Sequence, residues 1–260
     1  MSATAVAPGS VTTVFVPQDG SSSLGVSFAT ADGVTATVRP ASDTEIVLDD
    51  APASVEPVAG VLRRLDVSAS VRLDTDVPIG CGFGVSGAAT LATALAANAD
   101  QHLGYDRDAL VQAAHRAEVV AGTGLGDVFI QNRGGLVWDL GNGLRHADRS
   151  ARIEYAAFGE IATADVLGDE GAMERVVAAG RAAFDELDPC GPLPSLFDVS
   201  WRFADRVGLA TEPVRSAVAD VTRADGAATM AMVGETVVAT GVDGALPNAT
   251  RIASEGARVF

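Results

Sequence analysis

Lysine is missing from the sequence altogether, and all 18 basic residues are arginine. The 34 acidic residues outnumber them, which leaves a formal net charge of −16 at pH 7. A chain with so little positive charge lacks the general electrostatic attraction through which proteins hold nucleic acid or an anionic lipid surface. We therefore expect neither nucleic acid nor a membrane as a partner, and we expect any ligand to bind at a local site.

The missing lysine also indicates a particular solvent. Lysine is a flexible and strongly hydrated cation, and a surface without it tolerates many carboxylates in molar salt, where the screening length is ~3 Å. The composition therefore favours a protein from a halophilic archaeon. An acidic protein from a GC-rich bacterium is the alternative, which explains the charge but explains the missing lysine less well.

Cysteine is scarce, and long hydrophobic runs are absent. Cys81 and Cys190 are the only cysteines and lie in no metal-spaced cluster, which argues against a disulfide framework or a structural zinc site and favours the reducing cytoplasm. The longest apolar stretch, 87–99, is shorter than the ~20 residues of a membrane span, and the first ten residues do not resemble a signal peptide. With 260 residues, 48% of them hydrophobic, the chain can form one large domain or two modest ones.

Residue periodicity predicts strands first and helices later. Strands are predicted at 12–16, 24–30, 33–38, 44–48 and 67–73, then at 134–138, 151–158, 227–233 and 235–241. Helices are predicted at 86–98, 107–121, 172–187, 195–207 and 212–220, and the end of the chain is left unassigned. This order indicates an α+β fold in two sub-domains, residues 1–150 and 151–260.

The densest signal is the segment DVPIGCGFGVSGAATLATALAANA at 76–99, where Gly80, Gly82, Gly84 and Gly87 fall within eight positions. Glycines let the backbone approach a ligand closely, and the helix that follows directs its free N–H groups into the loop. We therefore predict a phosphate site, with a tight packed turn as the weaker alternative. A Walker A loop is excluded because it requires a lysine. The glycines also satisfy GxGxxG, but a second helix follows where a dinucleotide fold has a strand.

This segment resembles the second motif of the GHMP small-molecule kinases, PxxxGxGxS[SG]A. Together with 115–135, 195–211 and 227–240, it is similar in order, over almost the whole chain, to archaeal pantoate kinases. The resemblance implies a GHMP kinase fold, with an N-terminal sub-domain like domain 2 of ribosomal protein S5 and a ferredoxin-like C-terminal one. It also implies ATP-dependent phosphorylation of pantoate for coenzyme A biosynthesis. The alternatives are a kinase for another small hydroxylated acceptor and a catalytically weak binding protein.

The resemblance implies roles for individual residues. The ATP-binding positions are Pro78, Gly80, Cys81, Gly82, Gly84, Val85, Ser86, Gly87 and Ala88. Ser86 and Glu118 would hold Mg²⁺, with a helix N-cap and a solvated helix face as the alternatives. Asp127 closes a glycine-rich turn and would face the substrate hydroxyl as base or orienter, with an Asx-turn as the alternative. His115 is set aside as a metal ligand, because a packed or surface histidine is commoner and Mg²⁺ prefers oxygen.

The chain departs from the pantoate kinase pattern on the acceptor side. The expected substrate-side residues are Ser10, Leu24, Gly122, Thr123, Gly124, Arg133 and Asp139. Ser10 stands where the family has a histidine, and Leu24 and Asp139 stand where it has arginines. Because pantoate is a carboxylate, each lost charged hydrogen bond would weaken its binding by ~1–3 kcal/mol, unless Arg133 or Arg145 compensates. A homodimer is possible, although no residue pattern specifies its interface.

Overall fold

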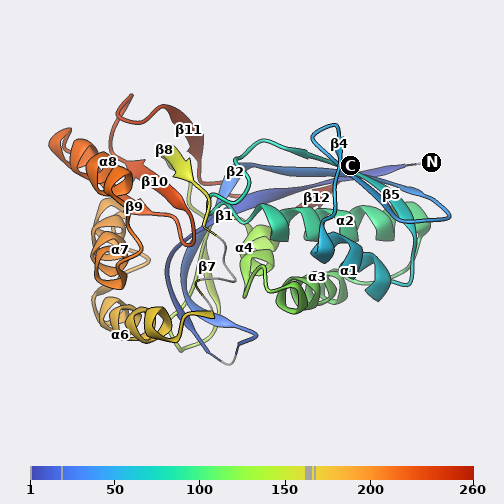
Figure 1. Cartoon of the computed structure of the whole chain (residues 1–260), viewed down its shortest axis with the longest axis horizontal. Helices are drawn as coiled ribbons and strands as arrows, with labels where there is room; N and C mark the ends of the chain where they lie inside the picture. Colours follow the sequence, from blue (N-terminus) through green and yellow to red (C-terminus); the bar gives the residue numbers. More distant parts are fainter. Residues whose placement is uncertain (1, 19, 162–165, 167) are drawn as a thin grey trace.

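Two β-sheets with helices packed on them make up the computed structural model, which describes residues 2–18, 20–161, 166 and 168–260 (Figure 1). The strands of the larger sheet are β1 (Ala3–Pro17), β2 (Ser23–Pro40), β3 (Glu45–Leu48), β4 (Ala51–Pro52), β5 (Ala69–Thr75), β6 (Leu136–Asp139), β7 (Arg145–Ala147) and β12 (Arg258–Val259). Its order is β12-β1-β2-β5-β3-β4, with β6 paired to β2 and β7 paired to β6. The smaller sheet has the order β11-β8-β10-β9. Its strands are β8 (Arg152–Gly159), β9 (Ala227–Met230), β10 (Glu235–Thr240) and β11 (Asn248–Arg251).

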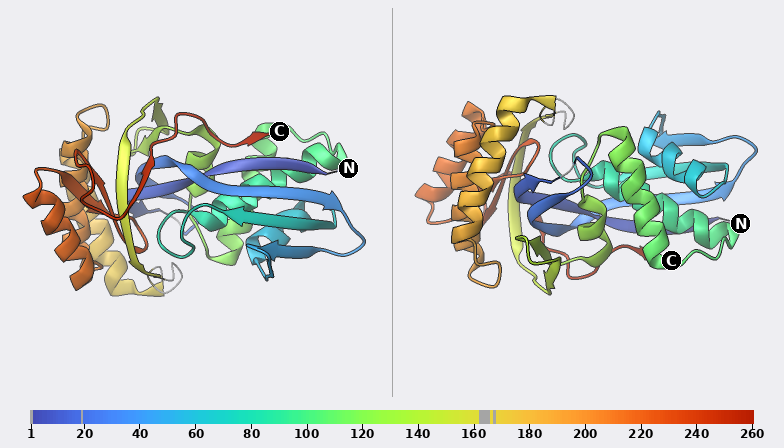
Figure 2. Two further views of the ribbon diagram at one scale, coloured as in Figure 1. Left: turned by 90° about the horizontal axis from the view of Figure 1, so that it is seen from above. Right: turned by 90° about the horizontal axis from the view of Figure 1, so that it is seen from below.

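The helices form two groups, one for each sheet. The first group is α1 (Glu56–Arg64), α2 (Val85–Gln101), α3 (Arg107–Ala121) and α4 (Asp127–Arg133), and the second is α6 (Glu170–Glu186), α7 (Leu193–Val207) and α8 (Glu212–Arg223). The first group lies along the larger sheet, and the second covers the outer face of the smaller sheet (Figures 1 and 2). Among the described residues, no helix is both long enough and apolar enough to span a membrane.

The long antiparallel ribbon of β1 and β2 joins the two halves of the molecule. Its far end packs on α6, where a Cβ at Gly180 would lie 2.4 Å from Cγ2 of Val16. Close by, the Met232 N–H donates to the carbonyl of Thr12 at 2.8 Å, which ties β1 to the chain after β9. The ribbon therefore contacts both groups of helices and brings β1 next to α6 and next to the chain after β9. Because β12 pairs with β1, both termini lie at the same end of the molecule (Figure 2). The division into sub-domains of residues 1–150 and 151–260 stays a prediction.

Two hydrophobic clusters form the core, and each contains residues of both sheets. The larger cluster, with Phe28, Leu62 and Leu91 fully buried, lies mainly between the larger sheet and its helices and continues to α7, where the Phe28 ring stacks on that of Phe197. The helix α2 is buried on nearly every side, which its alanines and glycine allow because small side chains let a helix approach its neighbours closely. The second cluster, which includes Phe203 and Met230, lies between the smaller sheet and the second group of helices.

The α+β class predicted from the sequence is confirmed, and so are the five predicted helices, with ends shifted by at most three residues. The strands predicted at 24–30 and 33–38 are one continuous strand, β2, and the short strands β4 and β7 were not predicted. Three further features were missed. The short helix α1 carries Pro57 in its first turn and buries Val58, Val61 and Leu62, a helical spacing that lay within a region assigned to strands. The seven-residue helix α4 is too short to show a period, and the unassigned end of the chain forms β11 and β12.

Candidate active site

The glycine-rich loop before α2 has a backbone that only glycine adopts without strain. The φ angles are +73° at Gly80, +85° at Gly82 and +60° at Gly84. Space is limiting as well, because a Cβ at Gly84 would lie 2.2 Å from Oγ of Ser10 and one at Gly82 would lie 3.1 Å from the carbonyl oxygen of Ala231. Both the backbone and the packing therefore require the glycines that the sequence places here.

The N-terminus of α2 opens into this loop. Gly84 is the N-cap and forms no side-chain cap, and the first turn contains no acidic residue. The first helical hydrogen bond runs from the Ala88 N–H to the Gly84 carbonyl at 3.0 Å, so the N–H groups of residues 85–87 are not used by the helix. These groups and the positive end of a 17-residue helix favour a bound anion. The alternative role of Ser86 as a helix N-cap is wrong, because the N-cap is Gly84 and Ser86 lies inside the helix.

Glu118 lies near the end of α3 and is buried, with only 3% of its surface exposed. Three hydroxyl groups donate to it: Ser86 and Thr90 to Oε1, at 2.9 and 2.7 Å, and Thr123 to Oε2 at 2.8 Å. Burial raises the pKa of Glu118, the three hydrogen bonds act in the opposite direction, and the nearby charge of Asp127 raises it further. The alternative of a solvated helix-face glutamate is therefore wrong.

Asp127 is the first residue of α4 and lies directly against the glycine-rich loop. The Ser10 hydroxyl donates to its Oδ1 at 2.8 Å. Its Cγ is 3.3 Å from the position that a Cβ of Gly84 would occupy, and its Cβ is 3.2 Å from the corresponding position at Gly87. Burial raises the pKa of Asp127, and the hydrogen bond from Ser10 opposes that change.

The two carboxylates converge at Gly124. A Cβ at this glycine would lie 3.4 Å from Oδ2 of Asp127 and 3.4 Å from Oε2 of Glu118. The backbone between them therefore carries no side chain that would separate the two acids. Among the described residues, no group of three or more His, Cys, Asp and Glu side chains is arranged to hold a metal, so the hard oxygen ligands here are two carboxylates and the nearby hydroxyl groups.

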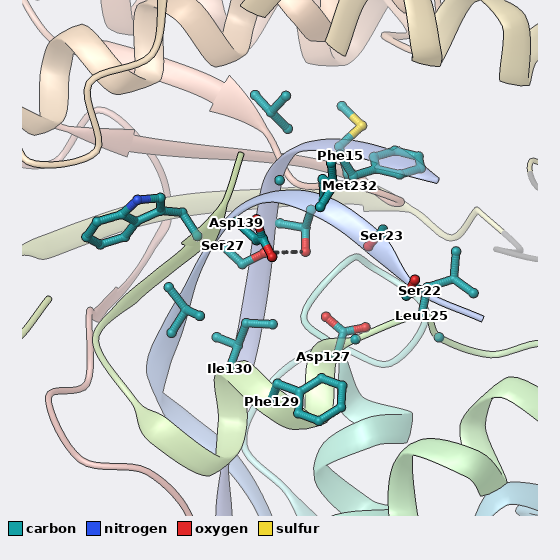
Figure 3. Close-up of a pocket in the computed structure, with 18 of the residues that line it drawn as sticks. Phe15, Ser22, Ser23, Ser27, Leu125, Asp127, Phe129, Ile130, Asp139 and Met232 are labelled. Atoms are coloured by element: carbon teal, nitrogen blue, oxygen red, sulfur yellow. Dashed lines mark hydrogen bonds between the residues drawn. The ribbon is translucent and has the colours of Figure 1, made fainter. Parts of the chain in front are cut away.

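A cavity of about 300 Å³ opens on the other side of Asp127. Figure 3 shows the Asp127 carboxylate pointing into it, with Phe129 and Ile130 on one side and Phe15 and Met232 on the opposite side. Its walls come from β1, β2, α4, β6 and the residues after β9, and they are largely apolar. Asp127 thus lies between the glycine-rich loop and a cavity large enough for a small organic molecule.

Four of the predicted substrate-side residues line this cavity together with Asp127. They are Leu24, Thr123, Gly124 and Asp139. Ser10 is buried next to Asp127 and does not line the cavity. Gly122 is the C-cap of α3 and does not line the cavity either. Arg133, at the end of α4, and Arg145, in β7, are exposed, and neither side chain lines the cavity.

Asp139 brings a second carboxylate to the cavity. Its Oδ1 accepts the N–H groups of Gly141 and Gly143 at 2.8 and 3.1 Å, so it also holds the turn between β6 and β7. No arginine side chain is part of the cavity lining that the structure describes. The cavity therefore presents apolar groups, hydroxyl groups and two acids.

Besides the apolar lining of the cavity, sequence reasoning missed two polar residues that support the site. Gln131 is fully buried and donates from Nε2 to the Gly84 carbonyl at 2.7 Å and to Oγ of Ser10 at 3.2 Å. It follows Asp127 by four residues, the spacing that puts two side chains on one helix face, so a prediction of α4 would have indicated it. Thr90 follows Ser86 by the same spacing, and both donate to Glu118.

His115 packs in the protein rather than taking part in the site. Its ring lies 4.8 Å from that of Phe129, and its Nδ1 atom is buried without a hydrogen-bond partner in the described part of the chain. Burial lowers its pKa. Of the two settings that the sequence left open, packed or surface, the contact with Phe129 supports the packed one.

Comparison with known proteins assigns the family. The model of the GHMP kinase N-terminal domain matches residues 53–135, which include the glycine-rich loop, Glu118 and Asp127. A pantoate kinase of Methanospirillum hungatei is 27% identical over 258 residues, covering 92% of this chain and 87% of that protein. A pantoate kinase of Methanocaldococcus jannaschii is 28% identical over 169 residues, covering 63% and 61%.

The fold agrees with that assignment. A solved structure described as a phosphotransferase related to the CoA biosynthesis pathway superposes with a TM-score of 0.86 at 22% identity, covering 100% of this chain and 99% of that one. The two-sheet α+β arrangement is therefore the GHMP kinase fold that the motifs predict. With the matched domain and relatives that extend over most of its length, the chain belongs to the GHMP kinase superfamily.

Proposed function

We propose that the protein is a pantoate kinase, which transfers the γ-phosphoryl group of ATP to a hydroxyl group of pantoate and gives 4-phosphopantoate and ADP. The observation that carries the proposal is the position of Asp127, whose side chain touches the glycine-rich loop on one side and lines the cavity on the other. A donor on the loop and an acceptor in the cavity would meet at this carboxylate. Both curated relatives are named pantoate kinases.

GHMP kinases use ATP, and the loop with the N-terminus of α2 is our proposed site for its phosphates. The N–H groups of residues 85–87 are not used by the helix, and the left-handed glycines keep side chains away from the backbone. Main-chain donors fixed in this way stabilise the charge of the phosphoryl group without the lysine of a Walker A loop. The ATP-binding positions proposed from the motif are Pro78, Gly80, Cys81, Gly82, Gly84, Val85, Ser86, Gly87 and Ala88.

We propose that Ser86 and Glu118 hold a Mg²⁺ ion with the phosphates. The fit rests on the donor set, because Mg²⁺ takes oxygen ligands and is bound in such enzymes through one or two carboxylates plus phosphate oxygens. Glu118 and Asp127 direct one oxygen each toward Gly124, and Ser86 already contacts Glu118. When bound, the ion would neutralise charge on the β- and γ-phosphates.

Asp127 is our proposed catalytic residue. It would orient the acceptor hydroxyl and accept its proton as the oxygen attacks the γ-phosphorus and the bond to ADP breaks. Burial raises its pKa above the ordinary value for aspartate, which makes the carboxylate a better proton acceptor. The hydrogen bond from Ser10 keeps Oδ1 occupied and leaves Oδ2 toward Gly124.

The test is an assay of ADP release and phosphorylated product with Mg-ATP and pantoate, in high KCl. We expect turnover by the wild type and a loss of kcat by a factor of ~10³ or more for Asp127→Asn, with the Kd for ATP unchanged. Asp108→Asn is the matched control, since Asp108 is an exposed residue of the first turn of α3 and should keep full activity. Nearly normal turnover by Asp127→Asn would remove the assignment.

A kinase for a different small hydroxylated acceptor is the second candidate. The observation that favours it is the lining of the cavity. Asp139 contributes a carboxylate to this lining, and among the described residues no arginine side chain belongs to it. A panel of neutral and anionic alcohols, assayed with the wild type and with Asp139→Asn, separates the candidates. Preference of the wild type for pantoate supports the first candidate. Preference for a neutral alcohol, with a gain for pantoate in Asp139→Asn, supports the second.

The setting of the enzyme is also part of the proposal. The scarcity of cysteine and the missing lysine support a cytoplasmic enzyme of a halophilic archaeon. A homodimer stays a prediction, which light scattering at high KCl would test.

A further inference from the structure

Gln131 forms hydrogen bonds with two other parts of the site. It lies on α4, its side chain is fully buried, and its Nε2 donates to the carbonyl of Gly84 at 2.7 Å and to Oγ of Ser10 at 3.2 Å. Ser10 in turn donates to Oδ1 of Asp127 at 2.8 Å. Three hydrogen bonds thus run in series from the glycine-rich loop to the carboxylate.

The direction of each hydrogen bond in this series is fixed by chemistry. The Gly84 carbonyl can only accept, so the amide nitrogen of Gln131 and not its oxygen must face it. The second hydrogen on that nitrogen then points to Ser10, whose oxygen accepts it. Because a hydroxyl group has one hydrogen, Ser10 is left to donate to Asp127.

Packing alone does not explain a glutamine at position 131. Its Oε1 atom is buried without a hydrogen-bond partner among the described residues, and it lies 2.8 Å from the position that a Cβ of Gly87 would occupy. An unpartnered buried oxygen is unfavourable, and a methionine of similar size would fill the space without one. The two hydrogen bonds that its nitrogen donates are what a glutamine provides here and a methionine would not.

The series of hydrogen bonds connects three parts of the site that belong to different structural elements. Gly84 is the N-cap of α2 and the end of the glycine-rich loop, Ser10 belongs to β1, and Asp127 begins α4. The Ser10 N–H also donates to the Phe83 carbonyl at 2.8 Å, so β1 is bound to the loop by its backbone as well. The Asp127 carboxylate is therefore connected to the loop at Gly84 through side-chain hydrogen bonds.

We propose that Gln131 and Ser10 are positioning residues that set the orientation of Asp127 according to the conformation of the glycine-rich loop. This proposal rests on the kinase function proposed above. It means that a nucleotide seated on the loop aligns the carboxylate for the acceptor. Neither Gln131 nor Ser10 lines the cavity, so in this proposal they act on the acceptor through Asp127.

The test compares Gln131→Met, Ser10→Ala and the double variant in steady-state kinetics. We expect each single variant to lower kcat by ~10-fold or more while the KM for ATP changes by less than ~2-fold, because the loop amides remain in place. The double variant should be no worse than the more severe single variant, since the two residues act in series. Losses that multiply would overturn the serial link, and values of kcat within ~2-fold of the wild type would overturn the proposal.

Ser200→Ala is the matched control. Ser200 is also a fully buried hydroxyl, and it donates to Oγ1 of Thr13 at 3.0 Å, outside the series. We expect this variant to lose thermal stability to a similar degree and to keep its kcat. If Gln131→Met does not fold, Ser10→Ala alone decides the outcome, because it removes the last two hydrogen bonds of the series.

Hydrogen–deuterium exchange with a non-hydrolysable ATP analogue gives a readout that needs no turnover. In the wild type and in Ser200→Ala, the analogue should slow exchange in residues 127–133, and in Gln131→Met this protection should be lost. Equal protection in Gln131→Met would contradict the coupling. If the wild type phosphorylates no acceptor, the proposed function fails, and the exchange result still decides whether the loop and α4 are coupled.

Discussion

Replacing Gly84 by alanine would place a methyl group at the point where the glycine-rich loop meets Asp127. The added Cβ would lie 2.2 Å from Oγ of Ser10, 2.9 Å from Nε2 of Gln131 and 3.3 Å from Cγ of Asp127. Ordinary contacts between heavy atoms begin near ~3.5 Å, so the Ser10 side chain would have to move by about 1 Å. The backbone adds a second cost, because the φ of +60° at Gly84 is unfavourable for an alanine by ~1–2 kcal/mol.

These two effects have different consequences. A displacement of ~1 Å in a group that orients the proposed catalytic residue should lower the rate by roughly 100-fold. The backbone strain alone should lower Tm by roughly 2–8 °C in a chain of this size, and the contact with Ser10 adds to that. The assays are ADP release with Mg-ATP and acceptor, and thermal denaturation of the same samples.

Gly208→Ala separates the two effects. Gly208 is the C-cap of α7, with a φ of +80°, and a Cβ there would meet no described atom within 4 Å. This variant should therefore lose stability through the backbone and keep its kcat. If Gly84→Ala has a kcat within ~2-fold of that of Gly208→Ala, the packing of Asp127 against the loop is not what the structure describes.

Three further predictions concern charge. Burial raises the pKa of Asp127, so the folded state loses stability as pH rises through that raised value. Asp127→Asn should therefore raise Tm in neutral buffer and change Tm little below the ordinary pKa of aspartate, as measured by calorimetry. Glu118→Gln should raise the Mg²⁺ concentration needed for half-maximal activity by ~10–100-fold, and an unchanged Mg²⁺ titration would exclude Glu118 from the metal site. The net charge of −16 predicts that Tm rises from dilute buffer to molar KCl, and equal stability in both would refute the assignment to a halophile.

The parts of the site that were predicted from the sequence are those with local signals. The glycines at 80, 82 and 84 are required by left-handed backbone angles, a property of a few adjacent residues that the motif preserves. Glu118 and Asp127 were identified because the resemblance extends through 115–135. The strong helical spacing of 107–121 also placed α3 correctly.

The parts that were missed depend on contacts between distant residues or on very short elements. Ser10 was noted as a departure from the family, but its hydrogen bond to Asp127 joins residues 117 positions apart. Gln131 lies on a helix of seven residues, which shows too few turns for a period. The alternative role of Ser86 as an N-cap is wrong because Gly84, two residues earlier, is the N-cap and the helix begins at Val85.

The cavity could not be predicted because its lining comes from widely separated segments. Leu24 and Asp139 meet there because β2 pairs with β6, in a register that sets Gly25 opposite Asp139. Met232 joins them because the chain after β9 is bonded to Thr12. No local pattern in the sequence records these pairings.

A crystal structure with a non-hydrolysable ATP analogue, Mg²⁺ and pantoate is the most direct measurement of the central claim. We expect the triphosphate to bind to the main-chain N–H groups at the start of α2, with its terminal phosphate facing an acceptor hydroxyl that contacts Asp127. A nucleotide bound away from the loop, or an Asp127 carboxylate turned away from the acceptor, would contradict the account.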